Sequence, residues 1–442
     1  MATVKRASGK EIFGWAMFDF ANSSYTTVII TVVFCVIFPK LIVGDGPEFR
    51  LGNLLWSASL SISYFIVLLT APLFGAIMDY TAAKKKFLFG SYILTVLATA
   101  ALVFVSPGSI ILAMVLVVLS NIGFSYSESF VSSFLPDLGP PDDLGKISGY
   151  AWGLGYFGGL SSTAIILFGL GALTMENFPN LRLVGPITGA FFLVAAIPTF
   201  LWVKERGTAR TLPAGENYFT MGFKRLKQTF IDIRDYRDLI ILLSSFFFAY
   251  AGLSIVISFA FIYGDQVIKW SGLVQMIMFI LTQLTAAGGA LLFGFLQDRW
   301  GAKGTLVSTL ILWVVSVTLI YGVDPATGFL NGIFGTSWEV QHVFLAIGSL
   351  AGMGLGATQS ACRAMVGLFS PDTKSGEFYG LWNLTGKLSA IFGLMGLGLL
   401  QHSFGMKNAI LACSVFFFIA IVIALFVNVD RGKAAAAEHS GE

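Results

Sequence analysis

Four charged side chains lie inside long apolar stretches of this 442-residue chain: Asp19, Glu128, Arg363 and Lys387. Charge inside a membrane-spanning segment is costly, and such residues usually face the interior of a helix bundle or a water-filled cavity. A carboxylate there can take up a proton, and the planar donor fork of Arg suits the carboxylate of a bound molecule. We therefore expect these positions to bind a solute or protons, and we assign no catalytic residue.

Asp19 is followed by Asn22, Ser23 and Thr26 at spacings of three, four and seven, which forms one polar stripe along a helix. At a rise of 1.5 Å per residue, Asp19 lies roughly 10 Å inside its apolar stretch. One interpretation is a substrate contact or a protonation site. The alternative is an Asp that packs between helices and pairs with a neighbouring Arg or Lys.

Glu128 and Arg363 lie 235 residues apart, and each precedes a Pro-Asp pair by the same interval. Asn121 and Gln359 lie on nearby turns of the same two stretches. Opposite charges at equivalent positions predict a salt bridge between Glu128 and Arg363 across the inner end of a helix bundle, or a substrate carboxylate bound by Arg363. The alternative is that each residue pairs within its own half of the chain.

Lys387 lies ten residues into its stretch, roughly 15 Å deep and near the midplane. Asn383 precedes it by one helical turn. The expected partners of Lys387 are Asp19, Glu128 and Glu377. It would compensate the charge of an acidic substrate or of a proton, or else form a structural ion pair.

Two tyrosines complete the set of candidates. Tyr250 lies on a polar face together with Ser254, and Tyr150 lies early in another apolar stretch. An aromatic ring with a polar tip suits a small amphipathic substrate. Because 14% of the chain is aromatic, most of its rings must simply pack or anchor helices at the membrane interface.

The composition places all these residues in a membrane. The chain is 56% hydrophobic and only 12% charged, with a mean hydropathy of +0.81, whereas soluble domains are about 25% charged. This excludes a soluble enzyme, a nucleic-acid-binding protein and a disordered chain, and the continuous apolar runs argue against a β-barrel. Three scattered Cys and three scattered His fit neither a disulfide framework nor a metal centre. We expect no cofactor and no metal.

The apolar runs predict an all-α polytopic membrane protein with 12 transmembrane helices, since about 20 residues cross a bilayer as a helix. The runs are 12–42, 55–78, 87–105, 109–135, 146–173, 183–203, 238–262, 271–296, 304–323, 340–369, 376–401 and 406–428. Of the 27 Lys and Arg, 20 then fall on one side of the membrane and five on the other. This bias predicts that both termini are cytoplasmic.

The longest polar stretch divides the twelve runs into six plus six. We expect four parts: an N-terminal six-helix bundle (1–203), a cytoplasmic linker (204–237), a C-terminal six-helix bundle (238–430) and a cytoplasmic tail (431–442). Apolar residues recur in the linker at helical spacing, beside several basic residues: Phe219, Phe223, Leu226, Phe230 and Ile233. The pattern predicts an amphipathic helix, either lying on the inner membrane face or packed against the bundle.

A short motif recurs in the loops after the second and eighth runs. The two copies are Gly75, Asp79, Lys84 and Lys85, and Gly294, Asp298, Arg299 and Lys303. Gly allows helices to approach closely, Asp can cap or pair with the next helix, and the basic residues hold the loop at the membrane surface. The motif resembles the G-x-x-x-D-R-x-G-R/K pattern of the major facilitator superfamily, although Tyr80 replaces the Arg in the first copy. The resemblance implies the major facilitator fold, with two pseudo-symmetric six-helix halves and gating loops at these positions.

Three further segments, 15–25, 134–159 and 359–387, carry dense runs of Trp, Tyr, Gly and polar residues. They resemble the vacuole-effluxer branch of that superfamily, the autophagy-related amino-acid effluxers of fungi and their bacterial relatives. The resemblance implies export or exchange of a solute, with amino acids as the fungal cargo.

We therefore expect a proton-coupled secondary transporter that moves a small polar solute, an amino acid or related metabolite, by alternating access. The Gly clusters are not followed by the Lys-Ser or Lys-Thr of a nucleotide-binding loop, which argues against an ATP-driven pump. We expect a monomer in a bacterial cytoplasmic (inner) membrane, with substrate, H⁺ and lipid as partners and no nucleic acid. The alternatives are transport of a lipid or bulky amphiphile, or a non-transporting receptor or assembly factor on the same scaffold.

Overall fold

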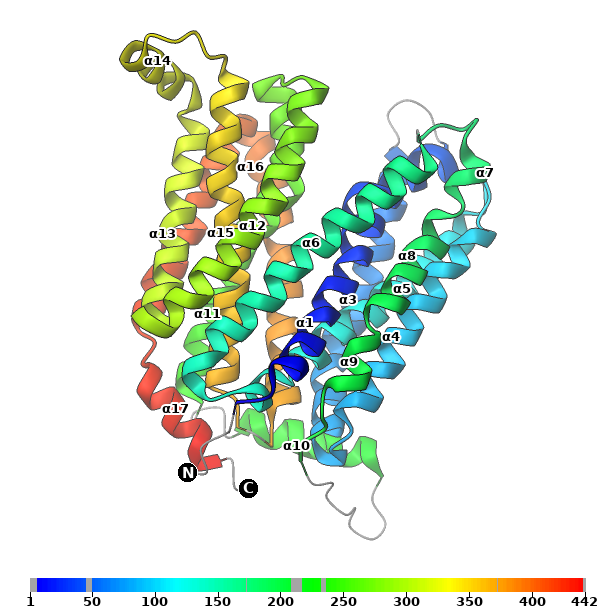
Figure 1. The fold of residues 1–442 in the computed structure, drawn as a ribbon, viewed down its shortest axis with the longest axis vertical. Coiled ribbons are helices and arrows are strands. Elements are labelled where there is room, and N and C mark those ends of the chain that lie inside the picture. The colour runs from blue at the N-terminus through cyan, green and yellow to red at the C-terminus, as the bar shows by residue number, and fades with distance from the viewer. Residues whose placement is uncertain are drawn as a thin grey trace.

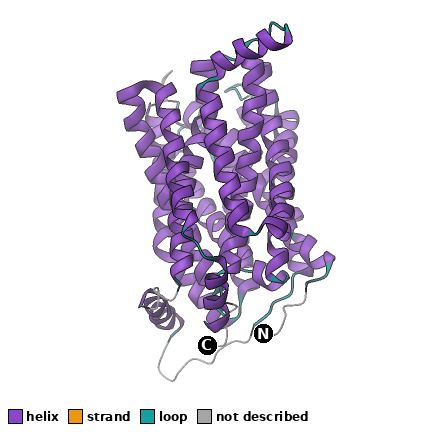
Figure 2. Ribbon diagram, turned by 90° about the vertical axis from the view of Figure 1, so that its left-hand side faces the viewer, coloured by secondary structure: helices purple, strands orange, loops and turns teal. Residues whose placement is uncertain are grey.

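The computed structural model describes residues 6–44, 50–171, 173–207, 217–231, 236–371 and 373–439, which consist of helices and the turns that join them (Figure 2). By length and composition, eleven helical segments in this part of the chain can cross a membrane. They are Gly9–Val43, Leu54–Thr81, Lys84–Phe104, Ile110–Leu138, Pro141–Leu170, Phe178–Trp202, Arg237–Ile257, Leu273–Trp300, Ala302–Tyr321, Val340–Leu368 and Lys407–Leu425.

The helices form two bundles that correspond to the two halves of the chain (Figure 1). The N-terminal half contains α1 (Gly9–Ser24), α2 (Phe34–Ile37), α3 (Arg50–Thr81), α4 (Lys84–Ala100), α5 (Ile110–Ser132), α6 (Leu144–Leu170), α7 (Phe178–Leu181), α8 (Val184–Ala195) and α9 (Ile197–Trp202). The C-terminal half contains α11 (Arg237–Tyr263), α12 (Gly272–Trp300), α13 (Ala302–Tyr321), α14 (Val323–Phe334), α15 (Val340–Leu368), α16 (Ser375–Leu425) and α17 (Val429–Glu438). In the sequence, α10 (Tyr218–Ile231) lies between the two halves.

The expected span 376–401 lies in α16, which has 51 residues. A straight helix of that length would reach about 75 Å, more than twice the thickness of the hydrocarbon core. Yet the N–H of Gly376 bonds to Asp79 at the end of α3, and the carbonyl of Leu425 accepts a bond from Lys303 at the start of α13. The end of α3 and the start of α13 lie toward the same end of the molecule (Figure 1). The chain of α16 therefore crosses the bundle twice, which completes the twelve expected crossings.

Two local features differ from a simple reading of the apolar runs. The first span contains two π-helical segments, Tyr25–Val32 and Phe38–Val43. The stretch after the ninth span, which falls between the expected apolar runs, forms the 12-residue helix α14. Three large apolar side chains of α14 are exposed: Phe329, Ile333 and Phe334.

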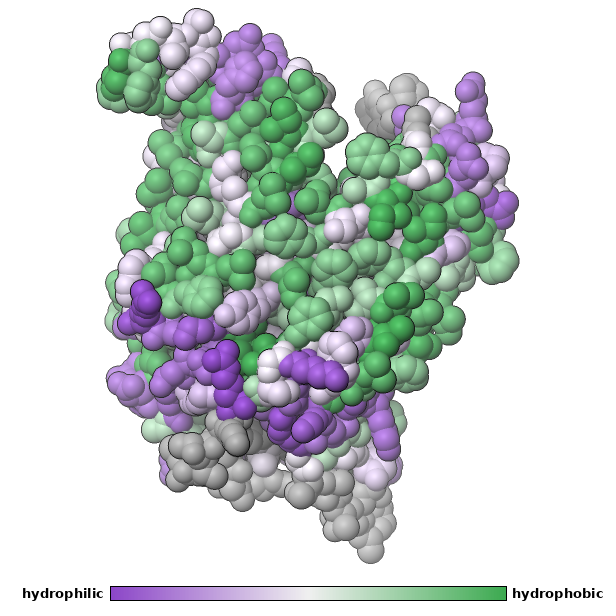
Figure 3. All heavy atoms as spheres, viewed as in Figure 1, coloured by the Kyte–Doolittle hydropathy of each residue, from purple (hydrophilic) through white to green (hydrophobic). Residues whose placement is uncertain are grey.

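The two halves touch at the end that carries both termini and diverge at the other end (Figure 1). A Cβ on Gly75 would lie 2.3 Å from the carbonyl oxygen of Gly376, and one on Gly149 would lie 2.5 Å from that of Ala290. Only glycine permits such contact between backbones of opposite halves. Figure 3 shows a hydrophilic band at this end and a hollow between apolar surfaces at the other. We call them the closed end and the open end.

Candidate functional site

Arg363 on α15 reaches across the closed end into the N-terminal half. Its Nη1 lies 2.5 Å from Oδ2 of Asp19 on α1. Its Nε and Nη2 donate to the hydroxyl and carbonyl oxygens of Ser148 on α6, at 3.2 and 3.1 Å. Only 3% of the Arg363 side chain and 11% of the Asp19 side chain are exposed. Arg363 therefore joins the two halves through a nearly dry ion pair.

Two indole rings enclose the same guanidinium group. Its central carbon lies 4.9 Å from the ring centre of Trp15 and 5.2 Å from that of Trp152. A guanidinium held against aromatic faces gains cation–π attraction, which is strongest where water is excluded. Asp19 and the hydroxyl and carbonyl oxygens of Ser148 supply its hydrogen-bond acceptors. The N-terminal half thus forms a complete socket for Arg363.

Lys387 on α16 forms the second charged contact between the halves. Its Nζ lies 3.7 Å from Oε2 of Glu128 on α5. The same ammonium lies 4.8 Å from the ring centre of Tyr64 and 6.0 Å from that of Phe124. Because 3.7 Å exceeds hydrogen-bond distance, this pair is looser than that of Arg363. It is also less buried, with 13% and 26% of the side chains of Lys387 and Glu128 exposed.

A cavity lies beside this looser pair, and both halves line it. The lining residues are Glu128, Trp152, Phe246, Tyr250, Gln359, Trp382, Asn383, Gly386 and Lys387. One acid, one base, two amides and four aromatic rings surround the space. Five of the eleven candidate substrate or coupling residues from the sequence are brought together here.

The polar contacts around the cavity repeat with the internal offset of the sequence. The side-chain nitrogen of Asn383 donates to the carbonyl of Ser125 at 2.7 Å, and the hydroxyl of Ser148 donates to the carbonyl of Ser360 at 2.9 Å. Ser148 and Asn383 are 235 positions apart, as are Ser125 and Ser360. One contact joins α16 to α5, and its equivalent joins α6 to α15.

The charged contacts follow the same symmetry. Glu128 and Arg363 are 235 positions apart, and so are Trp152 and Lys387. The ion pair of Glu128 with Lys387 is therefore the counterpart of the cation–π contact between Arg363 and Trp152. One side of the pseudo-twofold axis uses a carboxylate to hold its cation, and the other uses an indole ring.

The expected salt bridge between Glu128 and Arg363 is wrong. Arg363 pairs with Asp19, and Glu128 pairs with Lys387. The pseudo-symmetry explains this, because it places α5 against α16 and α15 against α6, so α5 and α15 are counterparts rather than partners. The alternative of pairing within each half is also wrong for these residues, since both pairs join the halves.

Four other candidates lie away from the cavity. The side-chain nitrogen of Asn121 donates to Ser63 of α3 at 2.5 Å, within the N-terminal half. The ring of Tyr150 packs edge-on against Phe295 at 5.7 Å, where α6 meets α12. Asn22 and Ser23 are not among the described residues that line the cavity. Figure 1 places α1, which carries both, along the closed half of the seam.

The first copy of the loop motif joins α3 to α16. The two carboxylate oxygens of Asp79 accept bonds from the backbone N–H groups of Gly376 and Glu377, both at 3.0 Å. These N–H groups belong to the first turn of α16, which has no partner for them within the helix. Asp79 therefore caps a helix of the opposite half and places its negative charge at the positive end of the helix dipole.

The second copy joins α12 to α6. Oδ2 of Asp298 lies 3.0 Å from Nζ of Lys146, which lies in the first turn of α6 and is also 3.7 Å from Asp143. A Cβ on Gly294 would lie 2.8 Å from the carbonyl oxygen of Gly145. Both copies thus bring a Gly and an Asp of one half against the start of a helix in the other.

The basic residues of the motif bond within their own halves. Lys84 bonds to Asp137 and to the carbonyl of Ser133, Lys85 to the carbonyls of Phe200 and Val203, and Lys303 to the carbonyl of Leu425. Arg299 is exposed. Of the expected gating residues, the glycines and aspartates make the contacts between halves. Asp372, in the second Pro-Asp pair, lies outside the described residues.

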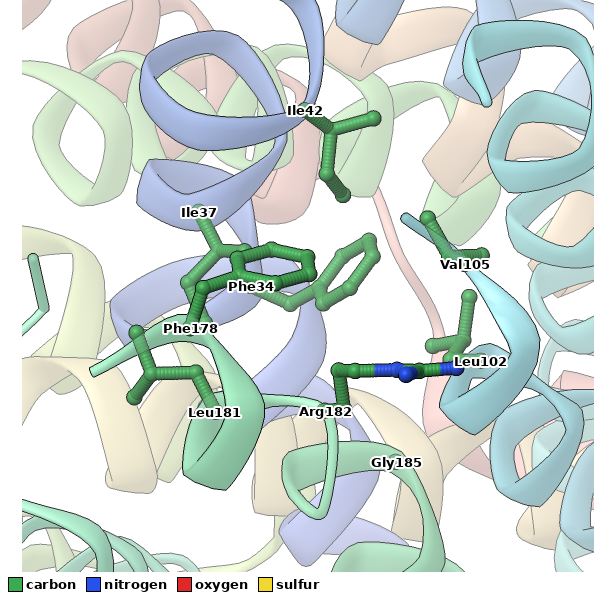
Figure 4. Close-up of a pocket in the computed structure, with 9 residues that line it drawn as sticks. All are labelled: Phe34, Ile37, Ile42, Leu102, Val105, Phe178, Leu181, Arg182 and Gly185. Carbon is green, nitrogen blue, oxygen red and sulfur yellow. The ribbon is translucent and has the colours of Figure 1, made fainter. Parts of the chain in front are cut away.

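A second small pocket lies in the N-terminal half, lined by residues of α2, α7 and their neighbours (Figure 4). Its lining is apolar except for Arg182, whose Nε donates to the carbonyl of Val103 at 2.8 Å. One half alone therefore forms this pocket, whereas both halves line the cavity beside Glu128 and Lys387.

Residues 56–437 match the model of the family described as "Vacuole effluxer Atg22 like". The chain belongs to this family. Among its relatives is the "Uncharacterized MFS-type transporter YxiO" of Bacillus subtilis (strain 168), 27% identical over 425 residues that cover 95% of each chain. Autophagy-related protein 22-1 of Penicillium rubens is 25% identical over 299 residues, which cover 65% of this chain and 50% of the fungal protein.

Solved structures confirm the major facilitator fold for this Atg22-like chain. The proton:xylose symporter XylE superposes with a TM-score of 0.70 at 12% identity and covers 95% of both chains. FucP in its outward conformation gives 0.68 at 14% identity, covering 94% of this chain and 98% of FucP. The fold and the family together make the chain a membrane transporter of the major facilitator superfamily, and its relatives are transporters rather than enzymes.

Proposed function

We propose that this chain is a secondary transporter that moves a small zwitterionic solute, an amino acid or a related metabolite, by proton-coupled alternating access. The observation that carries the proposal is the Glu128–Lys387 pair at the edge of a cavity that both halves line. At 3.7 Å the two charges attract one another without a hydrogen bond, so each keeps bonding capacity for another group.

A zwitterion satisfies both members of such a pair at once. Its carboxylate would bind Lys387 and its ammonium group would bind Glu128, so that neither partly buried charge loses a partner. The rings of Trp152, Phe246 and Trp382 would contact the apolar part of the solute. A solute with charge of one sign would leave Glu128 or Lys387 without compensation.

Proton coupling would involve the carboxylates that lose their cations when the closed end opens. In the closed arrangement Asp19 is paired with Arg363 and is nearly buried. Moving the halves apart at this end would separate them, because Asp19 and Arg363 belong to opposite halves. Without Arg363, Asp19 would lose the cation that stabilises its ionised form, and its affinity for a proton would rise. Proton uptake would then accompany the opening of the closed end.

The charge bias of the loops supports an orientation with the closed end at the cytoplasm, in the cytoplasmic membrane of a bacterium. Relatives named autophagy-related protein 22 are fungal, so location is part of the proposal. We expect a monomer, since each half supplies one wall of the same cavity.

Flux in proteoliposomes tests the proposal. Purified protein is reconstituted and exposed to a mixture of labelled amino acids, with and without an imposed pH gradient. We expect uptake of at least one zwitterionic amino acid, accelerated by the gradient, and loss of that uptake in Lys387→Met. Uptake that ignores the gradient would refute proton coupling. No uptake of any amino acid, with a folded protein, would refute the substrate class.

A further inference from the structure

Helix α10 lies crosswise at the closed end and stands at the flank of the bundle (Figures 1 and 2). It packs on the last turns of α3. A Cβ on Gly222 would lie 2.7 Å from a side-chain carbon of Ile77 and 2.9 Å from one of Leu73. The ring of Phe219 meets that of Phe74 edge-on at 6.5 Å. The expected amphipathic helix is thus attached to a membrane-spanning helix.

This attachment covers only part of the apolar side of α10. Phe219 and Phe223 remain 57% and 58% exposed. Large apolar side chains of α3 are exposed to a similar degree, such as Phe65 at 60% and Leu69 at 61%. Exposed apolar side chains on a helix that spans a membrane are suited to contact with lipid, whose tails are as apolar as Leu. The contact between Phe219 and Phe74 makes the exposed rings of α10 a continuation of that lipid-facing surface.

Two exposed lysines border these rings. Lys227 follows Phe223 by four residues and so lies on the same side of the helix one turn later. Lys224 precedes Lys227 by three residues and is therefore its neighbour on the helix surface. Cations beside a row of apolar rings are the pattern of a helix that lies in the membrane interface. The cytoplasmic leaflet attracts such cations through its anionic headgroups.

We propose that α10 is a membrane-surface helix. Its phenylalanine rings insert at the boundary of the acyl chains, and Lys224 and Lys227 bind the phosphates of anionic lipids. Because α10 packs on the turns of α3 between Leu73 and Ile77, this contact sits directly beside Asp79, which caps α16 in the opposite half. Anionic lipid would therefore stabilise the position of a helix end that closes the seam.

Spin labels in nanodiscs test this without any transported substrate, so the result is independent of the proposed function. Labels are placed singly at Phe223→Cys and Gln228→Cys, and protein without an added cysteine gives the background. Collision with oxygen, which dissolves in lipid, is compared with collision with a water-soluble nickel chelate. The discs contain phosphatidylcholine alone or with increasing phosphatidylglycerol.

We expect the label at 223 to favour oxygen and the label at 228 to favour the nickel chelate. Phosphatidylglycerol should further shield the label at 223 from nickel. The phosphatidylglycerol fraction that gives half of this shielding should rise about fivefold in each of Lys224→Gln and Lys227→Gln. It should stay unchanged in Lys433→Gln, which removes a charge on α17.

Three results would overturn the inference. Equal access of nickel to both labels would mean that α10 lies in water. Shielding of both labels from both reagents would mean that a protein surface, such as a second copy of the chain, covers α10. An identical response to phosphatidylglycerol after removal of both lysines would refute their role in lipid binding.

Discussion

Replacing Arg363 by Met should open the closed end. The substitution keeps much of the side-chain volume but removes the ion pair with Asp19, two bonds to Ser148 and two cation–π contacts. It also leaves the Asp19 carboxylate buried without its cation. Breaking a buried pair in this way costs about 3–5 kcal/mol. At 1.4 kcal/mol per factor of ten, the equilibrium should shift by roughly a hundredfold to a few thousandfold toward separation of the halves.

The assay is a distance between spin labels on the two halves. Lys86 on α4 and Arg299 at the end of α12 are both exposed at the closed end, so cysteines there should tolerate labels. In the parent protein we expect one short distance. In Arg363→Met we expect a longer distance to dominate.

Two further variants separate charge from packing. Asp19→Asn combined with Arg363→Met removes the stranded carboxylate, so the short distance should largely return. Arg363→Lys keeps the charge and loses the forked bonds to Ser148. The fraction of molecules with the short distance should therefore lie between that of the parent and that of Arg363→Met. If Arg363→Met leaves the short distance unchanged, Arg363 does not hold the halves together. If the double variant is as open as the single one, the buried charge of Asp19 is not the cause.

Three further outcomes concern the seam between the halves. Asp79→Ala should destabilise the closed arrangement by about 1–3 kcal/mol, because two N–H groups of α16 lose their acceptor, and Asp79→Asn should cost less; the same distance measurement ranks them. Gly75→Val should force the halves apart and lower the melting temperature, since its Cβ would lie 2.3 Å from the backbone of the opposite half. Gly90→Ala, whose Cβ would have no atom within 4 Å, should change neither the separation of the halves nor the melting temperature. Lys146→Gln should destabilise the closed arrangement by at most about 1 kcal/mol, because 30% of the Lys146 side chain is exposed. The measured distances should therefore change only slightly, and high salt should remove the difference between this variant and the parent.

The sequence predicts which residues carry charge inside the membrane, but it cannot predict their pairing. Asp19, Glu128, Arg363 and Lys387 allow several combinations at similar depths. The pairs depend on which helices the pseudo-symmetry brings together, and that is a property of the assembled halves. The equal depth of Glu128 and Arg363 therefore suggested a salt bridge between them, whereas the two residues occupy equivalent positions in the two halves.

The repeat nevertheless holds information that residue types alone do not. Ser148 and Trp152 both contact Arg363, and Trp152 also lines the cavity, but neither was chosen as a site residue from the sequence. They lie 235 positions before Asn383 and Lys387, which were. Applying the offset to every polar candidate would have found both. Other features leave no such trace, because the π-helical turns of the first span differ from α-helix only in hydrogen-bond spacing.

The distribution of charge between the halves would constrain the proposed transport cycle. Both acids of the central pairs, Asp19 and Glu128, belong to the N-terminal half, and both cations, Arg363 and Lys387, belong to the C-terminal half. Separating the halves at the closed end therefore leaves two negative charges on one wall and two positive charges on the other. A zwitterion can bridge the walls in one orientation only, with its ammonium group toward the N-terminal half. A simple anion would compensate the C-terminal wall alone, and the acids opposite would then require protons. Under the proposed proton coupling, the number of protons that move with each solute would depend on the charge of that solute, and the closed arrangement would be the state in which none is needed.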